Sequence, residues 1–410
     1  CPAKQKALKM VESRELEKKE EKNLEFSKNL GENIETIFKP STIKGSQFRK
    51  PYFEFSGACA GCGETPYIKL ATQLFGHRMV IANATGCSSI YSGSAPTSPF
   101  AKNKYGRGPA WASSLFEDNA EFGLGIKFAL DEKRETLKND VQKYLENHKD
   151  GELASLLRTW LENYNDGEKT YELSLKIAPL FKGTELEGQE SALTKESVFI
   201  IGGDGWAYDI GFGGLDQVLA SGQNVNILVL DTEVYSNTGG QMSKSTPLGA
   251  TAKFAMGGKR TPKKDLGMIA MSYKNVYVAQ VGLGANMNQT AQAFVEAESY
   301  DGPSLIIAYS PCINHGINMS ESQNEIKRAV ECGYLQLYRY DPRLIKEGKN
   351  PFRLDSGAPT KDYKEFLLGE SRYTALQKLS PELAEKLYEE SKQIAIEKYN
   401  KYVKLAKGED

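Results

Sequence analysis

Residues 197–232 read SVFIIGGDGWAYDIGFGGLDQVLASGQNVNILVLDT, in which two short apolar runs flank a segment whose apolar residues recur with helical spacing. The runs at 197–205 and 224–232 are typical of buried strands, and 207–222 is typical of a helix between them. Before this stretch the sequence predicts a strand at 78–86, and after it strands at 275–282 and 304–311 and a second helix at 288–302. Strands that alternate with helices indicate an α/β fold with a mainly parallel sheet flanked by helices.

The residues that follow these strands are the first place to look for function, because ligands of open α/β sheets bind at the carboxyl ends of the strands. Cys87 follows the run at 78–86, and Cys312 follows 304–311. The glycine-flanked Asp204 follows the strand that starts at 197, and the segment DTEVYSNTGGQ at 231–241 follows the next one. Two thiols and a glycine-rich acidic segment are therefore expected at one edge of the sheet.

A pair of cysteines, Cys59 and Cys62, lies in the stretch GACAGCGETPYIKL at 57–70. A disulfide, a zinc ion, a redox dithiol and an iron–sulfur cluster can each begin with such a pair. Structural zinc sites draw their ligands from two local pairs, and this chain has no second pair. The pair with Cys87 and Cys312 forms a set of four thiols that suits a 4Fe-4S cluster. Spacing alone leaves iron–sulfur, zinc and unligated buried cysteines open.

Asp204 and Thr232 form a second candidate pair, 28 residues apart at the ends of neighbouring predicted strands. A carboxylate beside glycines, together with a hydroxyl or nearby carbonyls, can complete the octahedral oxygen shell of Mg²⁺ bound to a diphosphate. The helix that begins near Trp206 or Ala207 points its N–H groups at the same place. The competing interpretation is a tight turn between strand and helix.

Composition and charge pattern exclude several other classes of protein. Lys and Arg number 52 against 53 Asp and Glu, with no long basic run, which argues against nucleic acid as a partner. No apolar run is long enough for a membrane span, and the charged first residues do not resemble a signal peptide. Six cysteines in 410 residues are too few for a secreted disulfide scaffold. The expectation is a cytoplasmic protein.

The chain divides by composition into three parts. Residues 1–50 are rich in Lys and Glu and are expected to form a solvated helix and a linker. Residues 51–320 hold the sheet, with a charged helical insertion expected at 131–195. Residues 321–410 are again charged and helical in period, and are expected to form a C-terminal helical extension.

Long motifs now identify a resemblance. GACAGCGETPY, NATGCSSIY, GRGPAWASSLFEDNAEFGLG, GGDGWAYDIGFGGLDQVLASG, DTEVYSNTGGQMSKSTPLGA and SPCINHGI resemble the C-terminal thiamine-diphosphate domain of pyruvate:ferredoxin (or flavodoxin) oxidoreductases, from about residue 51 onward. The resemblance implies a thiamine-diphosphate-binding fold. It also implies that Cys59, Cys62, Cys87 and Cys312 are ligands of the 4Fe-4S cluster nearest the thiamine, and that Asp204, Thr232 and the carbonyl of Val234 are Mg²⁺ ligands.

The same resemblance implies the residues that contact the cofactor. Diphosphate-binding positions are Gly203, Asp204, Gly205 and Trp206 in the first loop, and Thr232, Glu233, Val234, Tyr235, Ser236 and Asn237 in the second. Glu64 and Cys87 match positions that also touch thiamine diphosphate, and Asn237 matches an asparagine close to the reacting carbons. Thiamine motifs usually carry asparagine where Thr232 stands, although threonine suits this oxidoreductase branch.

The implied reaction is the oxidative decarboxylation of pyruvate with coenzyme A. Thiamine acts as an electron sink when CO₂ leaves, and an adjacent cluster passes the electrons one at a time to ferredoxin or flavodoxin. The implied assembly is a homodimer in which N-terminal domains of the same enzyme supply the pyruvate-binding residues and the glutamate that pairs with the aminopyrimidine. The alternatives are an oxidoreductase of another 2-oxo acid and a zinc-bound structural module.

Four further residues are interpreted without a catalytic role. The chain begins Cys1-Pro2, as a bacterial ferredoxin cysteine run ends, so Cys1 either completes an upstream cluster, with 1–50 as the linker after a ferredoxin-like domain, or has no role here. His315 is interpreted as a hydrogen-bonded structural histidine. Arg107 is assigned to packing or phosphate positioning, and Cys332 to an inert buried thiol.

Overall fold

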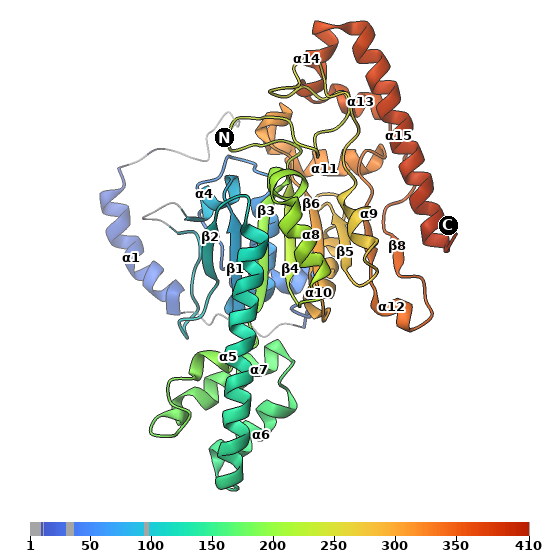
Figure 1. The fold of residues 1–410 in the computed structure, drawn as a ribbon. Helices are drawn as coiled ribbons and strands as arrows, with labels where there is room; N and C mark the ends of the chain where they lie inside the picture. Colours follow the sequence, from blue (N-terminus) through green and yellow to red (C-terminus); the bar gives the residue numbers. More distant parts are fainter. Residues whose placement is uncertain (1–9, 11, 30–36, 94–97, 410) are drawn as a thin grey trace.

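A single eight-stranded sheet organises the protein in a computed structural model, which describes residues 10, 12–29, 37–93 and 98–409 (Figure 1). Cys1 lies outside the described residues. The strand order is β2-β1-β3-β4-β6-β5-β7-β8. The strands are β1 (Met79–Ala84), β2 (Ala110–Ser114), β3 (Ser197–Gly203), β4 (Asn226–Asp231), β5 (Tyr277–Val281), β6 (Ser304–Tyr309), β7 (Tyr338–Tyr340) and β8 (Phe352–Leu354).

The first six strands run parallel to one another. Strand β7 is antiparallel to both of its neighbours, β5 and β8. All five predicted strands are confirmed, and with them the α/β class. β3, β4, β5 and β6 are apolar along almost their whole length and buried on both faces, as strands of a covered parallel sheet are. The register aligns Gly203 with Leu230 and Asp231 with Tyr309, so neighbouring strands end at the same edge. This edge brings the predicted strand-end residues together.

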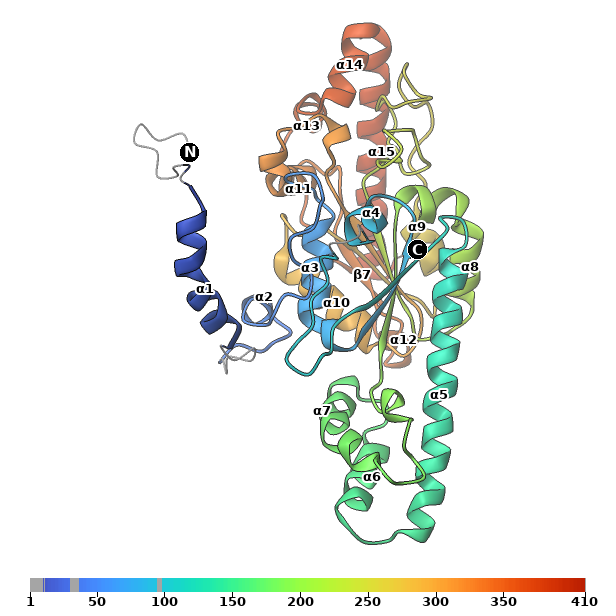
Figure 2. The same cartoon turned by 90° about the vertical axis from the view of Figure 1, so that its left-hand side faces the viewer.

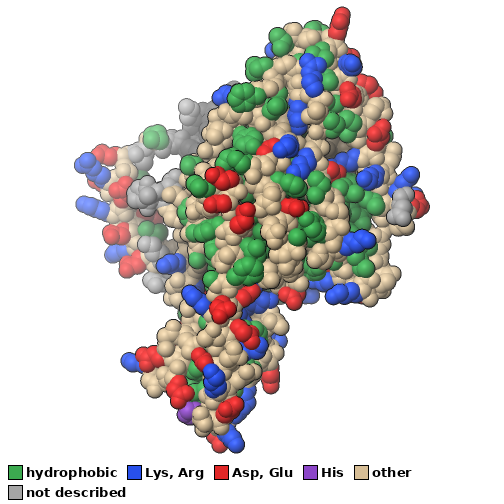
Figure 3. All heavy atoms as spheres, in the orientation of Figure 1, with side chains coloured by type: hydrophobic (Ala, Val, Ile, Leu, Met, Phe, Trp, Pro, Cys, Tyr) green, Lys and Arg blue, Asp and Glu red, His purple; other side chains and the backbone are tan. Residues whose placement is uncertain are grey.

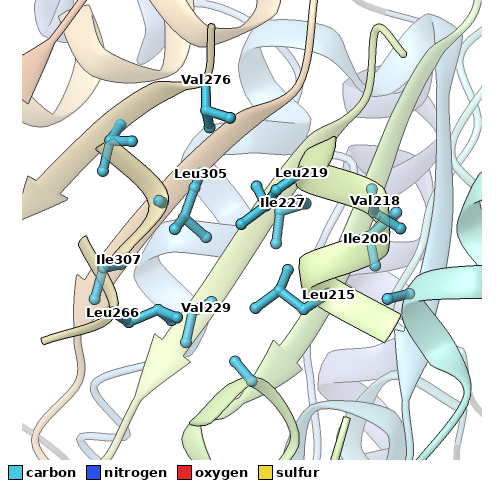
Figure 4. Packing of buried hydrophobic residues seen from close by; sticks show 14 of the residues in the cluster. Ile200, Leu215, Val218, Leu219, Ile227, Val229, Leu266, Val276, Leu305 and Ile307 are labelled. Atoms are coloured by element: carbon cyan, nitrogen blue, oxygen red, sulfur yellow. The ribbon is translucent and has the colours of Figure 1, made fainter. Parts of the chain in front are cut away.

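Helices cover both faces of the sheet. The core on one face includes residues of α5 (Asn119–Asn147), α8 (Phe212–Ala220) and α9 (Leu266–Met271), and the core on the other includes residues of α3 (Thr65–Phe75) and α10 (Met287–Ser299). Figure 4 shows the first core, where Leu215 and Val218 of α8 lie over Ile200 and Val229 of the sheet. Interdigitated branched side chains of this kind fix the strand ends in place.

The helical insertion has its own hydrophobic core. Helix α5 continues well beyond the sheet, as Figure 2 shows, and is followed by α6 (Glu152–Glu162), α7 (Gly167–Ile177) and the 3₁₀ turns η2 (Ala178–Phe181) and η3 (Glu190–Ala192). Trp160 and Phe181 are fully buried there. Residue 131, the expected start of the insertion, lies inside α5, because the first part of this helix already packs on the sheet.

The part of the chain from residue 321 is helical but also adds β7 and β8 to the sheet. Its helices are α11 (Ser322–Glu331), α12 (Arg343–Lys346), α13 (Tyr363–Leu368), α14 (Ser371–Leu379) and α15 (Pro381–Lys407). Tyr402 of α15 packs against Tyr338 and Phe352 of the two strands, with ring centroids 5.1 and 5.5 Å away. This region is therefore an integral part of the sheet domain rather than a separate extension.

The remaining elements are short or peripheral. They are α1 (Arg14–Asn29), α2 (Ile43–Ser46), η1 (Gly76–Arg78), α4 (Cys87–Gly93), the π-helical turn η4 (Gly205–Ile210), η5 (Ile313–His315) and η6 (Met319–Glu321). On the face in Figure 3, positive and negative side chains are intermingled, without a continuous basic surface. None of the helices that the structure describes combines the length and apolarity needed to span a bilayer.

Candidate cofactor and metal site at the strand ends

Four cysteines line one cavity of about 160 Å³ at the edge where β1 and β6 end. Cys59 and Cys62 come from the loop before α3, Cys87 begins α4 directly after β1, and Cys312 follows β6. We refer to this cavity as the thiol pocket. Two strands, β3 and β4, lie between β1 and β6 in the sheet, and the loop before α3 lines the same cavity as the residues that follow β1 and β6. The fold thus brings together the four thiols that the resemblance selects.

The four thiols of the pocket match, in kind and number, the ligands of a 4Fe-4S cluster. All five cysteines in the described residues are free thiols, so the Cys59–Cys62 pair is not a disulfide. Within the described ranges, no three His, Cys, Asp or Glu side chains converge as they do around one metal ion. In a 4Fe-4S cluster each thiolate binds a different iron, so the four sulfurs surround the cluster instead of meeting at a point.

Burial raises the pKa of three of these thiols, which favours their protonated form. Desolvation, followed by the charge of Glu64, raises the pKa of Cys62 and of Cys87 to about 12. Burial also raises the pKa of Cys312. A cationic iron centre is what such thiols need in order to become thiolate ligands.

Glu64 is the single carboxyl group among the residues that line the thiol pocket. It is 3 % exposed, and its Oε2 accepts a hydrogen bond from the Tyr91 hydroxyl at 2.8 Å. Burial raises the pKa of Glu64 to about 7, and the Tyr91 hydrogen bond opposes this shift only in part. Glu64 can therefore hold or release a proton near neutral pH, as an acid–base group must.

The loop after β4 forms another wall of the thiol pocket. Thr232, Ser236 and Asn237 line it, and Ser236 Oγ lies 3.2 Å from the sulfur of Cys87. The Asn237 side chain is exposed. The second predicted cofactor loop and the cysteines therefore border the same space.

Three oxygen atoms meet on the other side of Thr232. Its Oγ1 lies 3.0 Å from Asp204 Oδ1 and 3.1 Å from the carbonyl oxygen of Val234. Neighbouring ligands of an octahedral Mg²⁺ ion are about 2.9 Å apart, given metal–oxygen distances of about 2.0 to 2.1 Å. The two distances from Thr232 Oγ1 to the other predicted Mg²⁺ ligands thus match the spacing of neighbouring ligands in an octahedral shell.

Asp204 is enclosed by the polypeptide and is only 1 % exposed. Ser243 Oγ donates a 2.5 Å hydrogen bond to its Oδ2, in addition to the Thr232 contact on Oδ1. Burial, and then the negative charge of Asp231, raises the pKa of Asp204 well above its usual range. The charge of Lys263 opposes this shift only in part, and a divalent cation beside the carboxylate would supply further positive charge.

The two glycines of the first predicted cofactor loop differ in how closely they are packed. A Cβ at Gly205 would lie 2.5 Å from the Tyr235 ring, whereas a Cβ at Gly203 would meet only the carbonyl oxygen of Leu230, at 3.8 Å. Trp206 is 1 % exposed and belongs to the core. Of this loop, Gly203 leaves space for a ligand, and Gly205 and Trp206 are used for packing.

The Glu233 side chain turns away from the thiol pocket. Lys263 Nζ donates to its Oε1 at 2.9 Å, and Arg372 Nη2 donates to its Oε2 at 2.8 Å. Burial alone would raise the pKa of Glu233, but the charges of Lys263 and Arg372 dominate and lower it to about 2. This carboxylate is therefore charged and already paired.

Several residues of this site carried no sequence signal. Ser243 and Lys263 belong to the long segment between β4 and α9, and Arg372 lies in α14. Each reaches the site only through the tertiary fold. Their contacts with Asp204 and Glu233 show that they complete the polar shell of the site.

The structure describes three of the four residues that were assigned no catalytic role, and the fourth, Cys1, lies outside the described residues. His315 is fully buried, and its Nε2 lies 2.8 Å from the carbonyl oxygen of Thr232. Arg107 lies 3.7 Å from Glu196, just before β3, at the opposite edge of the sheet from the strand-end site. Cys332 is buried in the core of the C-terminal helices.

Comparison with known proteins first gives the class. Residues 179–308 match the family described as thiamine pyrophosphate enzyme, C-terminal TPP binding domain. This range includes β3, β4, Asp204 and the whole loop from Thr232 to Asn237. The central part of the sheet is thus similar to a thiamine pyrophosphate-binding domain.

The particular relatives are pyruvate oxidoreductases. The chain is homologous over its whole length to the pyruvate:ferredoxin oxidoreductase of Moorella thermoacetica, with 56% identity over 421 residues. It is 53% identical over 420 residues to the pyruvate-flavodoxin oxidoreductase of Klebsiella pneumoniae. A mitochondrial NADP⁺ pyruvate dehydrogenase of Euglena gracilis is 51% identical over 380 residues, which cover 90% of this chain and 21% of that protein. The chain spans 36% of the length of the first two relatives.

Proposed function

We propose that this chain is the thiamine-diphosphate and proximal 4Fe-4S part of an enzyme that oxidatively decarboxylates pyruvate to acetyl-CoA and CO₂. The observation that carries this proposal is the position of Thr232. It lines the thiol pocket and also lies within 3.1 Å of the other two members of the oxygen set. A cluster held by the thiol pocket and a cofactor held at the oxygen set would both border this one residue, and the cluster would supply one-electron transfer there.

The oxygen set supports the metal part of the proposal. Asp204, Thr232 and Val234 would hold Mg²⁺, whose remaining positions are free for diphosphate oxygens and water. Gly203, with no side chain and no close neighbour, lets a diphosphate approach the backbone. These residues bind and orient the cofactor.

Bound thiamine diphosphate supplies a carbon nucleophile and an electron sink, and a 4Fe-4S cluster supplies one-electron transfer. The protein contributes an acid–base group and a polar group beside them. Glu64 is buried and titrates near neutral pH, so it can hold a proton close to the cofactor. Asn237, on the wall of the thiol pocket, presents a neutral amide that can stabilise developing negative charge on the substrate.

The partners in this proposal follow from the relatives. Because the chain spans 36% of their length, other domains of the same enzyme would contribute the pyruvate-binding residues. Coenzyme A would accept the acetyl group, and ferredoxin or flavodoxin would accept the electrons. A reducing cytoplasm suits the free thiols of the pocket.

Metal analysis of the 410-residue chain, purified without oxygen, tests the cluster. We expect iron and sulfide with a broad absorption in the blue. Cys312→Ser should lower the iron content, whereas the matched Cys332→Ser should not, because Cys332 is buried in a separate core. Zinc without colour would overturn the cluster assignment, as would wild-type iron in the Cys312 variant.

Titration of the same chain with Mg²⁺ and thiamine diphosphate tests the cofactor assignment. Heat released on binding, measured by calorimetry, is expected only when both components are present, since the diphosphate binds through the metal. A chain that binds neither component, with its cluster intact, would contradict the assignment.

A further inference from the structure

The turn Thr232–Val234 is held in a conformation that its own sequence does not favour. Glu233 has a φ of +61°, in the left-handed region that residues with a side chain rarely adopt. Such a conformation is unfavourable and persists only where the surrounding structure imposes it. Here it allows Thr232 Oγ1 and the Val234 carbonyl to approach within 3.1 Å of each other while the Glu233 side chain points in another direction.

The Glu233 carboxylate provides the first attachment of this turn. It accepts hydrogen bonds from Lys263, Tyr334 and Arg372, at 2.9, 2.6 and 2.8 Å. Glu233 is 2 % exposed, and the three donors come from three separate parts of the chain. The middle residue of the turn is therefore fixed by three groups that are not among the described residues lining the thiol pocket.

His315 provides the second attachment. Its Nε2 must carry the hydrogen, because its 2.8 Å partner, the Thr232 carbonyl, can only accept one. The other ring nitrogen faces Glu370 at 3.6 Å, and Glu370 accepts a 2.5 Å hydrogen bond from Arg372 Nε. Arg372 bonds Glu233 in turn, so a closed set of contacts links the carbonyl of Thr232 to the side chain of Glu233.

We propose that Glu233 and His315 are positioning residues that fix the Thr232–Val234 turn. They hold Thr232 Oγ1 and the Val234 carbonyl oxygen in place as two preformed ligand positions for Mg²⁺. Neither side chain contacts the metal or the diphosphate. Groups that orient metal ligands from behind typically change metal affinity about 10- to 100-fold when removed. This inference rests on the proposed function, since it concerns the same Mg²⁺ site.

The test compares two substitutions of His315 in the 410-residue chain. A Gln side chain can still donate a hydrogen bond to the Thr232 carbonyl, whereas Leu fills similar space without a donor. His315→Leu should raise the Mg²⁺ concentration for half-saturation, at fixed thiamine diphosphate, about tenfold or more. His315→Gln should stay within about threefold of the wild-type value. Calorimetry measures binding, and iron analysis reports whether the neighbouring cluster loop is intact.

The outcomes separate this inference from the proposed function. If the wild-type chain binds no Mg²⁺–thiamine diphosphate, the proposed function fails. If it binds, then wild-type Mg²⁺ dependence in His315→Leu overturns the inference, as does equal loss in the Leu and Gln variants. Should His315→Leu not fold, Tyr334→Phe removes only one hydroxyl from Glu233. Its Mg²⁺ half-saturation should rise with unchanged iron content, and an unchanged value would refute the role of Glu233.

Discussion

Two adjacent glycines at the end of β3 should respond oppositely to the same substitution. A Cβ at Gly202 would lie 2.4 Å from the Trp206 ring and 2.9 Å from the Cβ of Ala84, inside the packed core. A Cβ at Gly203 would meet only a carbonyl oxygen at 3.8 Å, which is an ordinary contact. Neither glycine has the positive φ that would strain alanine. Gly202→Ala and Gly203→Ala thus form a matched pair.

The expected magnitudes follow from these contacts. Gly202→Ala forces the buried indole ring to move, and overpacking of this kind costs about 1 to 3 kcal/mol of unfolding free energy. Gly203→Ala should leave the cofactor-free protein as stable as the wild type, or about 0.4 to 1 kcal/mol more stable, because alanine restricts the unfolded chain. In the proposed site, however, its methyl group occupies the space through which the diphosphate approaches the backbone. We expect its affinity for Mg²⁺–thiamine diphosphate to fall by about tenfold, which corresponds to about 1.4 kcal/mol.

Urea denaturation without cofactor measures the stability of each variant, and calorimetry measures binding. If Gly203→Ala is stable and binds the cofactor like the wild type, the diphosphate does not lie against Gly203. If Gly202→Ala is as stable as the wild type, the packing argument is wrong. Loss of stability in both variants would show that the space beside Gly203 is not available to a side chain.

Three other predictions concern separate features. Asp204→Ala should abolish tight Mg²⁺–thiamine diphosphate binding while the iron content stays unchanged, and cofactor retained through gel filtration would refute this. Asn237→Ala, in an enzyme of the relatives' full length, should slow single-turnover cluster reduction by pyruvate by about 2.7 to 4 kcal/mol of barrier at saturating cofactor; a wild-type rate would remove Asn237 from catalysis. Burial alone raises the pKa of Glu168, but neighbouring His77 and two arginines lower it to about 2, below the ordinary 4.5. The stability that Glu168 contributes is complete above pH 4.5 and is lost as pH falls towards 2. In Glu168→Gln the free energy of unfolding should therefore depend less on pH between 4.5 and 2, and an unchanged pH dependence would contradict this.

The strands that sequence analysis located are those buried on both faces. β3, β4 and β6 are continuous apolar runs, so their composition alone marks them. β2, with the sequence AWASS, lies at the sheet edge and has few branched residues, and β7 and β8 are three residues long. β8 lies at the other edge of the sheet, and β7 lies between β5 and β8. These three strands are fixed by their pairing partners and not by local propensity, which is why they were missed.

The site shows the same division. Cys59 and Cys62 precede α3 and were joined to the set only as thiols. Cys87, Cys312 and Asp204 come at the ends of predicted strands, and the shared edge of a parallel sheet brings them together, so their approximate location could be inferred. The roles of the residues that hold them could not. Arg372 contacts Glu233 across 139 positions of sequence, and no periodicity or motif relates the two. Glu233 itself lies in a cofactor motif, yet its side chain faces away from the thiol pocket because the left-handed turn directs it there.

The helical insertion joins the sheet domain at the end opposite the thiol pocket. It leads directly into the start of β3, and its Glu168 contacts Arg78, the residue before β1, at 3.1 Å. The exposed turn between α5 and α6, at residues 147–151, therefore offers an attachment point for a fluorophore or a surface tether. A single-molecule experiment could fix the protein through this turn and leave the cofactor edge open to solution, with the length of α5 serving as a built-in spacer.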